Sequence, residues 1–297
     1  MLERAKSGNH AAEEENTAKT VGPGPGWPNP APAGAYSLPR APPAFAMIVN
    51  PTATGWQVIY QQAHALLAAQ LAWAWPPFLP PDRWVGLLAA VAQHDDEQAA
   101  WHGRGGHHGL TPAGAPANFT QQPFSSEQAT GVLHAARFQG RWRSLLTSLH
   151  LSTLYEGLRG SDPAITAFLD ELRAGQERWH RELKLTKTEV RRSYDLLHWC
   201  DRLSLILCRQ ELPEMGREVE VYRHPGRPAA GAHYVRQPGG PGTPVVVRPW
   251  PFAADALVVS VEALELHELR FRDDAALAAA LRTAPVHTLN WELRRDA

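Results

Sequence analysis

Apolar residues recur at helical spacing through the middle of the chain and alternate nearer its ends. Residues 61–75 carry apolar side chains three and four positions apart and end at a proline pair, which predicts a helix. The same spacing predicts helices over 84–93, from Ser125 or Ser126 onward, and over 142–157, 163–184 and 186–208. Gly/Pro-rich turns separate β-rich runs at 45–49, 56–60, 218–222, 244–248, 257–265 and 287–293, with one short helix at 273–282.

These elements divide the chain into three parts. Residues 1–44 are crowded with Pro, Gly and Ala and predict a disordered leader. Residues 45–213 predict a helical domain with a short N-terminal hairpin, and residues 214–297 a small β-rich C-terminal appendage. The expected fold class is therefore mainly α.

Composition narrows the classes of function. The chain of 297 residues has 29 Lys+Arg and 30 Asp+Glu, so it lacks the positive charge of a general nucleic-acid binder. It has no uninterrupted apolar stretch of roughly 18 residues, which argues against a membrane partner. The first residues are charged and polar rather than signal-like, and two cysteines make no disulfide framework. We expect a cytoplasmic protein of unknown oligomeric state.

Several ionisable residues stand where a helix should be apolar. His64 shares a helical face with Leu67 and Leu71, and Asp201 lies between Leu197 and Leu205. The full set of such residues is His64, His94, Asp95, His150 and Asp201. A buried carboxylate without a partner costs on the order of several kcal/mol, so it is normally paired, protonated or metal-bound.

One divalent cation would satisfy these carboxylates and histidines together. Imidazole and carboxylate ligands suit Mn, Fe, Co, Ni or Zn. A different interpretation is that each histidine is a core residue with one hydrogen bond and that each Asp anchors a helix to a loop. Spacing alone leaves both interpretations open.

The order His64, His94-Asp95, Asp201 resembles the HD-domain superfamily, an all-helical fold whose ligands bind metal and usually hydrolyse phosphate esters. The segments QQAHALLAAQLAWAW, LLAAVAQHDDEQAAWH, LLTSLHLSTLY, HWCDRLSLILC and VVVRPWPF resemble domain-of-unknown-function family 3891, a bacterial family. That family usually continues from His-Asp through a small residue to Gly-Trp. Here Asp96, Glu97 and Gln98 follow the doublet, so the turn after it differs.

The superfamily resemblance implies a metal-dependent phosphohydrolase acting on a phosphorylated small molecule. Asp95 would bind metal and take part in catalysis, with Asp96 or Glu97 as a base or orienting group. A two-metal version would add His150, or less readily His134. The alternatives are a two-iron oxygenase on the same scaffold and a non-catalytic protein that binds a ligand or partner.

Other polar residues are open to two interpretations. The group Arg137, Arg141 and Arg143 would hold a phosphate or form a solvated surface. The loop at residues 103–109 would close over a ligand or remain an ordinary loop. His198 would hydrogen-bond near the site or face solvent, and Ser148 and Tyr155 would line a pocket or complete their helix.

Overall fold

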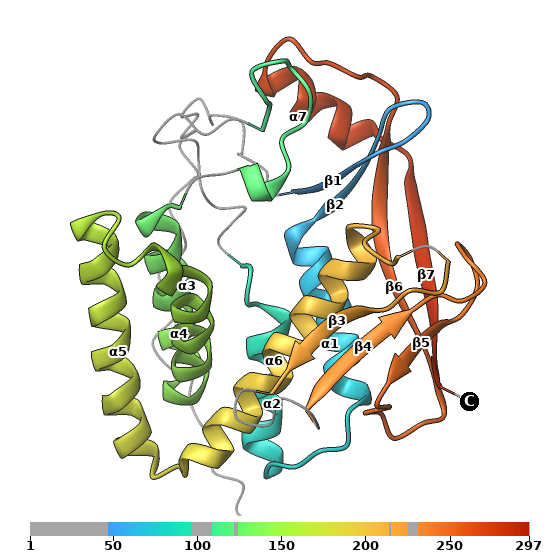
Figure 1. Ribbon diagram of the computed structural model, residues 1–297. Helices are drawn as coiled ribbons and strands as arrows, with labels where there is room; N and C mark the ends of the chain where they lie inside the picture. Colours follow the sequence, from blue (N-terminus) through green and yellow to red (C-terminus); the bar gives the residue numbers. More distant parts are fainter. Residues whose placement is uncertain (1–46, 97–108, 122–123, 214, 225–230, 297) are drawn as a thin grey trace, which may run out of the picture. The chain divides into compact units, whose positions relative to one another are not determined.

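The computed structural model describes residues 47–96, 109–121, 124–213, 215–224 and 231–296 (Figure 1). The strands are β1 (Met47–Pro51), β2 (Trp56–Tyr60), β3 (Val219–Arg223), β4 (Ala232–Arg236), β5 (Val245–Arg248), β6 (Ala256–Leu266) and β7 (Val286–Arg295). The helices are α1 (Gln61–Ala74), α2 (Pro81–Ala92), α3 (Ser126–Phe138), α4 (Arg141–Tyr155), α5 (Pro163–Leu183), α6 (Lys187–Cys208) and α7 (Asp274–Thr283), with 3-10 turns at Phe119–Gln121 and Glu156–Leu158. The helices predicted from periodicity are confirmed within a few residues, whereas β4 was not predicted.

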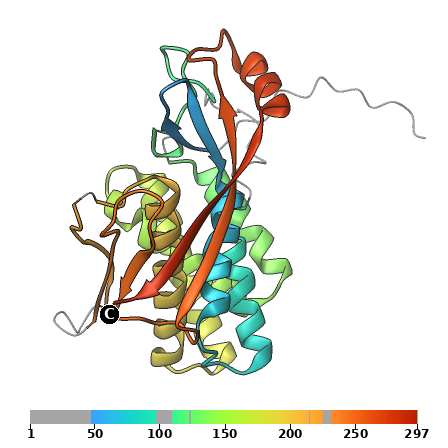
Figure 2. The same ribbon diagram turned by 90° about the vertical axis from the view of Figure 1, so that its right-hand side faces the viewer.

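Seven strands form one curled, mixed sheet in the order β1-β2-β6-β7-β5-β4-β3. Neighbouring strands are antiparallel, except that β5 and β7 run parallel. The longest pairing joins β6 to β7, from Ala256 opposite Arg294 to Leu264 opposite Val286. These two long strands run through the middle of the sheet (Figure 2).

The prediction of a mainly α, HD-like bundle is wrong, because the protein has an α/β fold. β2 pairs with β6, so the N-terminal hairpin belongs to the same sheet as the C-terminal strands. The Gln70 amide on α1 donates to the Ser260 carbonyl at 2.8 Å and accepts from the Ser260 backbone N–H at 3.0 Å. Residues on both sides of the expected boundary at 213/214 therefore share one sheet. The expected leader, 1–44, lies outside the described residues.

The helices lie in layers beside this sheet. α1 packs on β6 and α6 on β3, while α2 and α4 pack against this inner pair. α3 and α5 lie farther from the sheet and pack on α4 (Figure 1). One core includes Ile59, Leu71, Leu197 and Val259, so strand and helix side chains bury each other.

A smaller core closes the end of the sheet near the β1–β2 hairpin. Met47, Val58, Leu266 and Leu277 are buried there, which seats α7 against the hairpin. Of the helices that the structure describes, none is both long and apolar enough to cross a bilayer.

Candidate metal centre

Four helical segments bring the five predicted metal ligands together. His64 lies on α1, His94 and Asp95 in the turn after α2, His150 on α4 and Asp201 on α6. Each of the five is less than 8 % exposed. The amphipathic spacing that marked them in the sequence does point them into the protein interior.

The turn that carries His94 and Asp95 is fixed by contacts from α4. Arg143 is buried and its guanidinium donates to the carbonyl of Gln93 at 3.1 Å. The Trp142 indole N–H donates to the Arg83 carbonyl at 2.9 Å, and a Cβ on Gly86 would lie only 2.8 Å from the Trp142 ring. Because position 86 has no side chain, α4 approaches α2 closely at this point.

The hydrogen bonds of His64 define which of its nitrogens carries a proton. The Ser204 hydroxyl donates to the Asp201 carbonyl at 2.8 Å, so its oxygen is left to accept. His64 Nδ1 lies 2.9 Å from that oxygen and must be the donor. In a neutral imidazole, Nε2 then carries a lone pair, and it lies 2.6 Å from Asp95 Oδ2.

His94 repeats this arrangement. Its Nδ1 lies 2.7 Å from the Val91 carbonyl, which can only accept, so Nδ1–H is the donor. Its Nε2 lies 3.2 Å from Asp201 Oδ1 and 3.3 Å from Asp95 Oδ2. Both imidazoles thus donate Nδ1–H to an oxygen outside the carboxylate pair and direct Nε2 towards carboxylate oxygens.

A lone pair facing a carboxylate oxygen is repulsive unless a positive charge lies between them. That charge is either a proton on Nε2 or a metal ion. His64, His94 and Asp201 each offer one ligand atom within 4.8 Å of the others. Metal-binding histidines characteristically donate their second ring N–H to a carbonyl or another oxygen, as both do here.

The electrostatics of the cluster favour positive charge. Burial disfavours an imidazolium, yet Asp95 and Asp201 together raise the pKa of His94 to about 10. Burial also opposes the two carboxylates, but the neighbouring imidazoles hold the pKa of Asp95 and of Asp201 below the usual range. Asp95 and Asp201 are therefore both ionised in the protein interior at pH 7.

His150 differs from the other two histidines. Its ring centre lies 5.2 Å from that of His94, and its Nδ1 has no hydrogen-bond partner among the described residues. Burial lowers the pKa of His150 to about 4, so the ring is neutral at pH 7. Tyr155 lies on the same helix, and burial together with the charge of Asp95 raises its pKa to about 12, so it keeps its hydroxyl proton.

The remaining sequence candidates are more scattered. Asp96 is half-buried in the turn, and its carboxylate partly offsets the lowering of the Arg143 pKa by burial. Arg143 is thus a structural residue of the turn rather than a surface charge. His134 is exposed and packs on Phe138, so it is not part of the cluster.

Three other candidates contact residues outside the cluster. The Ser148 hydroxyl donates to the Leu172 carbonyl at 3.3 Å, so it joins α4 to α5. Arg137 and Arg141 lie near Glu171 and Glu182 as exposed ion pairs. Glu97 and residues 103–108 of the expected closing loop lie outside the described residues.

A cavity of about 690 Å³ is lined by residues of α4, α5, α6 and β3, and none of the five cluster residues is among them. Tyr194 and His198 line it, and the same Tyr194 ring lies 6.3 Å from His150. His198 stacks on Tyr194 and is partly buried, which lowers its pKa. Cationic side chains from α6 and β3 also line this cavity, namely Lys187, Arg191, Arg202 and Arg223.

Sequence reasoning missed Ser204, which orients His64. Its only signal is its position three residues after Asp201, on nearly the same face of the helix. Tyr194 was also missed, although it lies about two helical turns before Asp201 on α6. Both are polar residues on the stripe that carries Asp201.

Fold and site together define an α/β protein with a buried histidine–carboxylate centre. The chain belongs to the family of proteins of unknown function DUF3891, whose profile matches residues 47–268. This match includes all five residues of the cluster and confirms the resemblance to that family. No curated protein and no solved structure matches the chain. The resemblance to HD-domain proteins is therefore not supported by any of these comparisons.

Proposed function

We propose that the buried cluster binds a divalent metal ion and that the protein hydrolyses a phosphate ester of a small molecule. One observation carries the metal assignment: His64 and His94 both donate Nδ1–H to an oxygen outside the carboxylate pair and turn Nε2 inwards, that of His64 towards Asp95 and that of His94 towards Asp95 and Asp201. A cation in this position relieves the repulsion between these groups.

The ligands would be His64, His94, Asp95 and Asp201. Such a set suits Mn, Fe, Co, Ni or Zn, and His150 lies close enough to the cluster to serve a second ion. The bound ion would supply Lewis acidity towards a phosphoryl oxygen and would lower the pKa of its water to about 7.

The surrounding residues have separate roles in this proposal. Ser204 and the Val91 carbonyl hold the two imidazoles in orientation, and Arg143 holds the turn that bears Asp95. His150 is neutral at pH 7, so its ring would be able to bind the second ion. Asp96, in the same turn, remains the candidate base or orienting group.

The cavity lined by Tyr194 and His198 supports a phosphorylated substrate. Lys187 and three arginines line it, against the carboxylates of Asp195 and Glu220. The arginines pair with Asp195, Glu211 and Glu220, while Lys187 has no acidic partner among the described residues. Four cationic side chains around one cavity favour an anionic ligand. Tyr194 lines this cavity and its ring lies 6.3 Å from that of His150, so it would contact a substrate that extends from the cavity towards the cluster.

Metal analysis of protein purified without added metal tests the proposal directly. We expect close to one equivalent or more of a mid-row divalent metal, together with hydrolysis of p-nitrophenyl phosphate or bis(p-nitrophenyl) phosphate. Asp201→Asn keeps the shape of the side chain but removes its charge, so this variant should lose most of the metal and the activity. Glu171→Gln is the control, since that residue is exposed and pairs only loosely with Arg137 at 3.5 Å.

Equal metal content in the two variants would refute the assignment. Protein that holds no metal, and whose melting temperature a chelator leaves unchanged, would indicate a hydrogen-bonded core network instead. Iron in the protein, with substrate-dependent oxygen uptake and no phosphate release, would indicate the oxygenase.

A further inference from the structure

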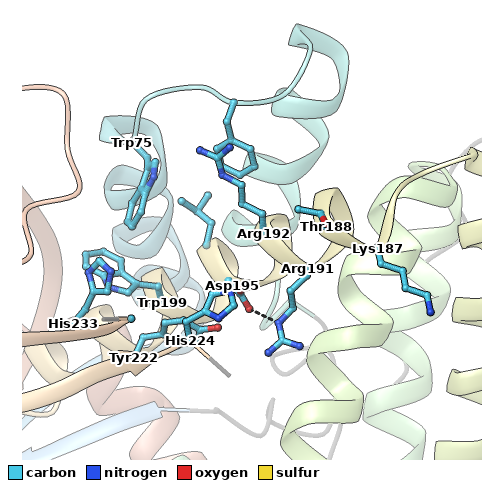
Figure 3. A pocket seen from close by; sticks show the side chains of 13 residues that line it. Trp75, Lys187, Thr188, Arg191, Arg192, Asp195, Trp199, Tyr222, His224 and His233 are labelled. Atoms are coloured by element: carbon cyan, nitrogen blue, oxygen red, sulfur yellow. Dashed lines mark hydrogen bonds and ion pairs between the residues drawn. The ribbon is translucent and has the colours of Figure 1, made fainter. Parts of the chain in front are cut away.

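A second cavity, of about 760 Å³, lies beside the first half of α6 (Figure 3). Its walls come from the segment after α1, from α6 and from the β3–β4 pair. Trp199 lines it and lies only two residues before Asp201. Two helical residues advance by about 200°, so this cavity lies on the opposite face of α6 from the metal centre.

One end of this cavity is aromatic. Trp75 and Trp199 pack edge to face with ring centres 5.0 Å apart. The His233 ring lies 5.9 Å from Trp199 and 6.5 Å from Trp75. Figure 3 shows these three rings gathered at one side of the cavity. Such a wall accepts the face or edge of a planar ring.

The other end is cationic. Lys187, Arg191 and Arg192 line it, and Figure 3 shows them on the side away from the tryptophans. Arg191 pairs with Asp195 at 2.9 Å, while the Arg192 guanidinium lies 3.9 Å from the Phe78 ring centre. Among the described residues, neither Lys187 nor Arg192 has an acidic partner, and Asp195 is the one acidic residue that lines the cavity.

Unsatisfied nitrogen atoms gather around the same cavity. Trp199 is 1 % exposed, and its indole N–H has no hydrogen-bond acceptor among the described residues. His224 and His233 each have a buried Nδ1 without a hydrogen-bond partner there. Buried polar groups are normally hydrogen-bonded, so several that lack a partner among the described residues around one cavity favour a site that receives a polar ligand.

We propose that this cavity binds a nucleoside monophosphate, with the base against Trp75, Trp199 and His233 and the phosphate beside Arg191 and Arg192. The volume is in the range of small-molecule sites. Rings lie at one end and three cations at the other, of which Lys187 and Arg192 have no acidic partner among the described residues. This arrangement matches a ligand with a planar ring joined to an anionic group. None of the proposed metal ligands lines this cavity, although it shares Lys187, Arg191, Asp195 and Tyr222 with the cavity that we assign to the hydrolase substrate.

Calorimetric titration of the full chain with the four common nucleoside monophosphates tests this assignment. We expect at least one to bind in the micromolar range, and its nucleoside and inorganic phosphate to bind at least about tenfold more weakly, because each fills one end only. Arg192→Gln should weaken the nucleotide by about tenfold and leave the nucleoside unchanged. Trp75→Leu should weaken both, with its melting temperature measured alongside.

A matched control is Arg178→Gln. Arg178 also lies over an indole ring, that of Trp179 at 5.4 Å, but it lines a different cavity. The Arg178→Gln variant should bind the nucleotide with the same affinity as the unmodified protein. Failure of all four nucleotides to bind at millimolar concentration would overturn the proposal, as would equal loss in the Arg192 and Arg178 variants. Asp201→Asn should bind nucleotide normally, which separates this result from the metal assignment.

Discussion

Ser204→Ala removes the oxygen that orients His64 and leaves every proposed ligand in place. The Ser204 hydroxyl accepts the His64 Nδ1–H at 2.9 Å and donates to the Asp201 carbonyl at 2.8 Å. Without it, the His64 ring loses its fixed orientation and Nε2 no longer points reliably at Asp95. If the cluster binds metal, this variant should bind it more weakly while retaining the fold.

The expected loss follows from how outer hydrogen bonds act on ligands. Removal of such a partner typically lowers metal affinity about 10- to 100-fold. At about 1.4 kcal/mol per factor of ten, that corresponds to roughly 1.4–2.8 kcal/mol. Titration of the metal-free protein against a chromogenic chelator measures this affinity, and circular dichroism measures the melting temperature.

Ser193→Ala is the matched control for this experiment. Ser193 lies on the same helix, is equally buried and donates to the Glu189 carbonyl of its own helix at 2.8 Å. Its removal should alter stability without affecting metal affinity. Unchanged affinity in Ser204→Ala, or an equal loss in both variants, would refute the proposed orientation of His64.

Two further predictions concern the interior. Leu197→Ala, at a fully buried position of α6, should cost about 2–5 kcal/mol in chemical denaturation, whereas the exposed Leu66→Ala should change stability by no more than about 0.5 kcal/mol. Similar losses in both would contradict the packing described. Burial raises the pKa of Cys208 to about 12 and raises that of Cys200 as well. Both thiols should therefore resist Ellman's reagent at pH 8 in the folded protein and react in denaturant, and rapid native labelling would contradict their burial.

Local patterns predicted the helices well because the signals that begin and end them lie within a few residues. Thr186 forms a capping box with Glu189, accepting from its backbone N–H at 3.1 Å. Ser125 accepts from the Gln128 backbone N–H at 3.2 Å, as its position before α3 predicted. Such contacts are visible in sequence order alone.

The assembly of the strands was not predictable in the same way. β2 and β6 are far apart in sequence, since Trp56 pairs with Leu266. No local pattern in either strand specifies this partner. All C-terminal strands except β4 were located in the sequence, but their pairing with the N-terminal hairpin was not predicted. One sheet was therefore interpreted as a hairpin plus an appendage. β4 escaped prediction because it lies between two Gly/Pro-rich segments.

The candidate metal centre was partly predictable. Ionisable residues on apolar stripes could be found from spacing, since burying them requires a compensating partner. The role of Ser204 could not, because a helical serine commonly bonds to a carbonyl of its own helix, as Ser144 does with Gly140 at 2.9 Å. Ser204 makes such a bond too, and only its distance to His64 distinguishes it. The residues that could hold a cation were therefore predictable one by one, whereas the contacts that would tune them depend on how α1 and α6 pack.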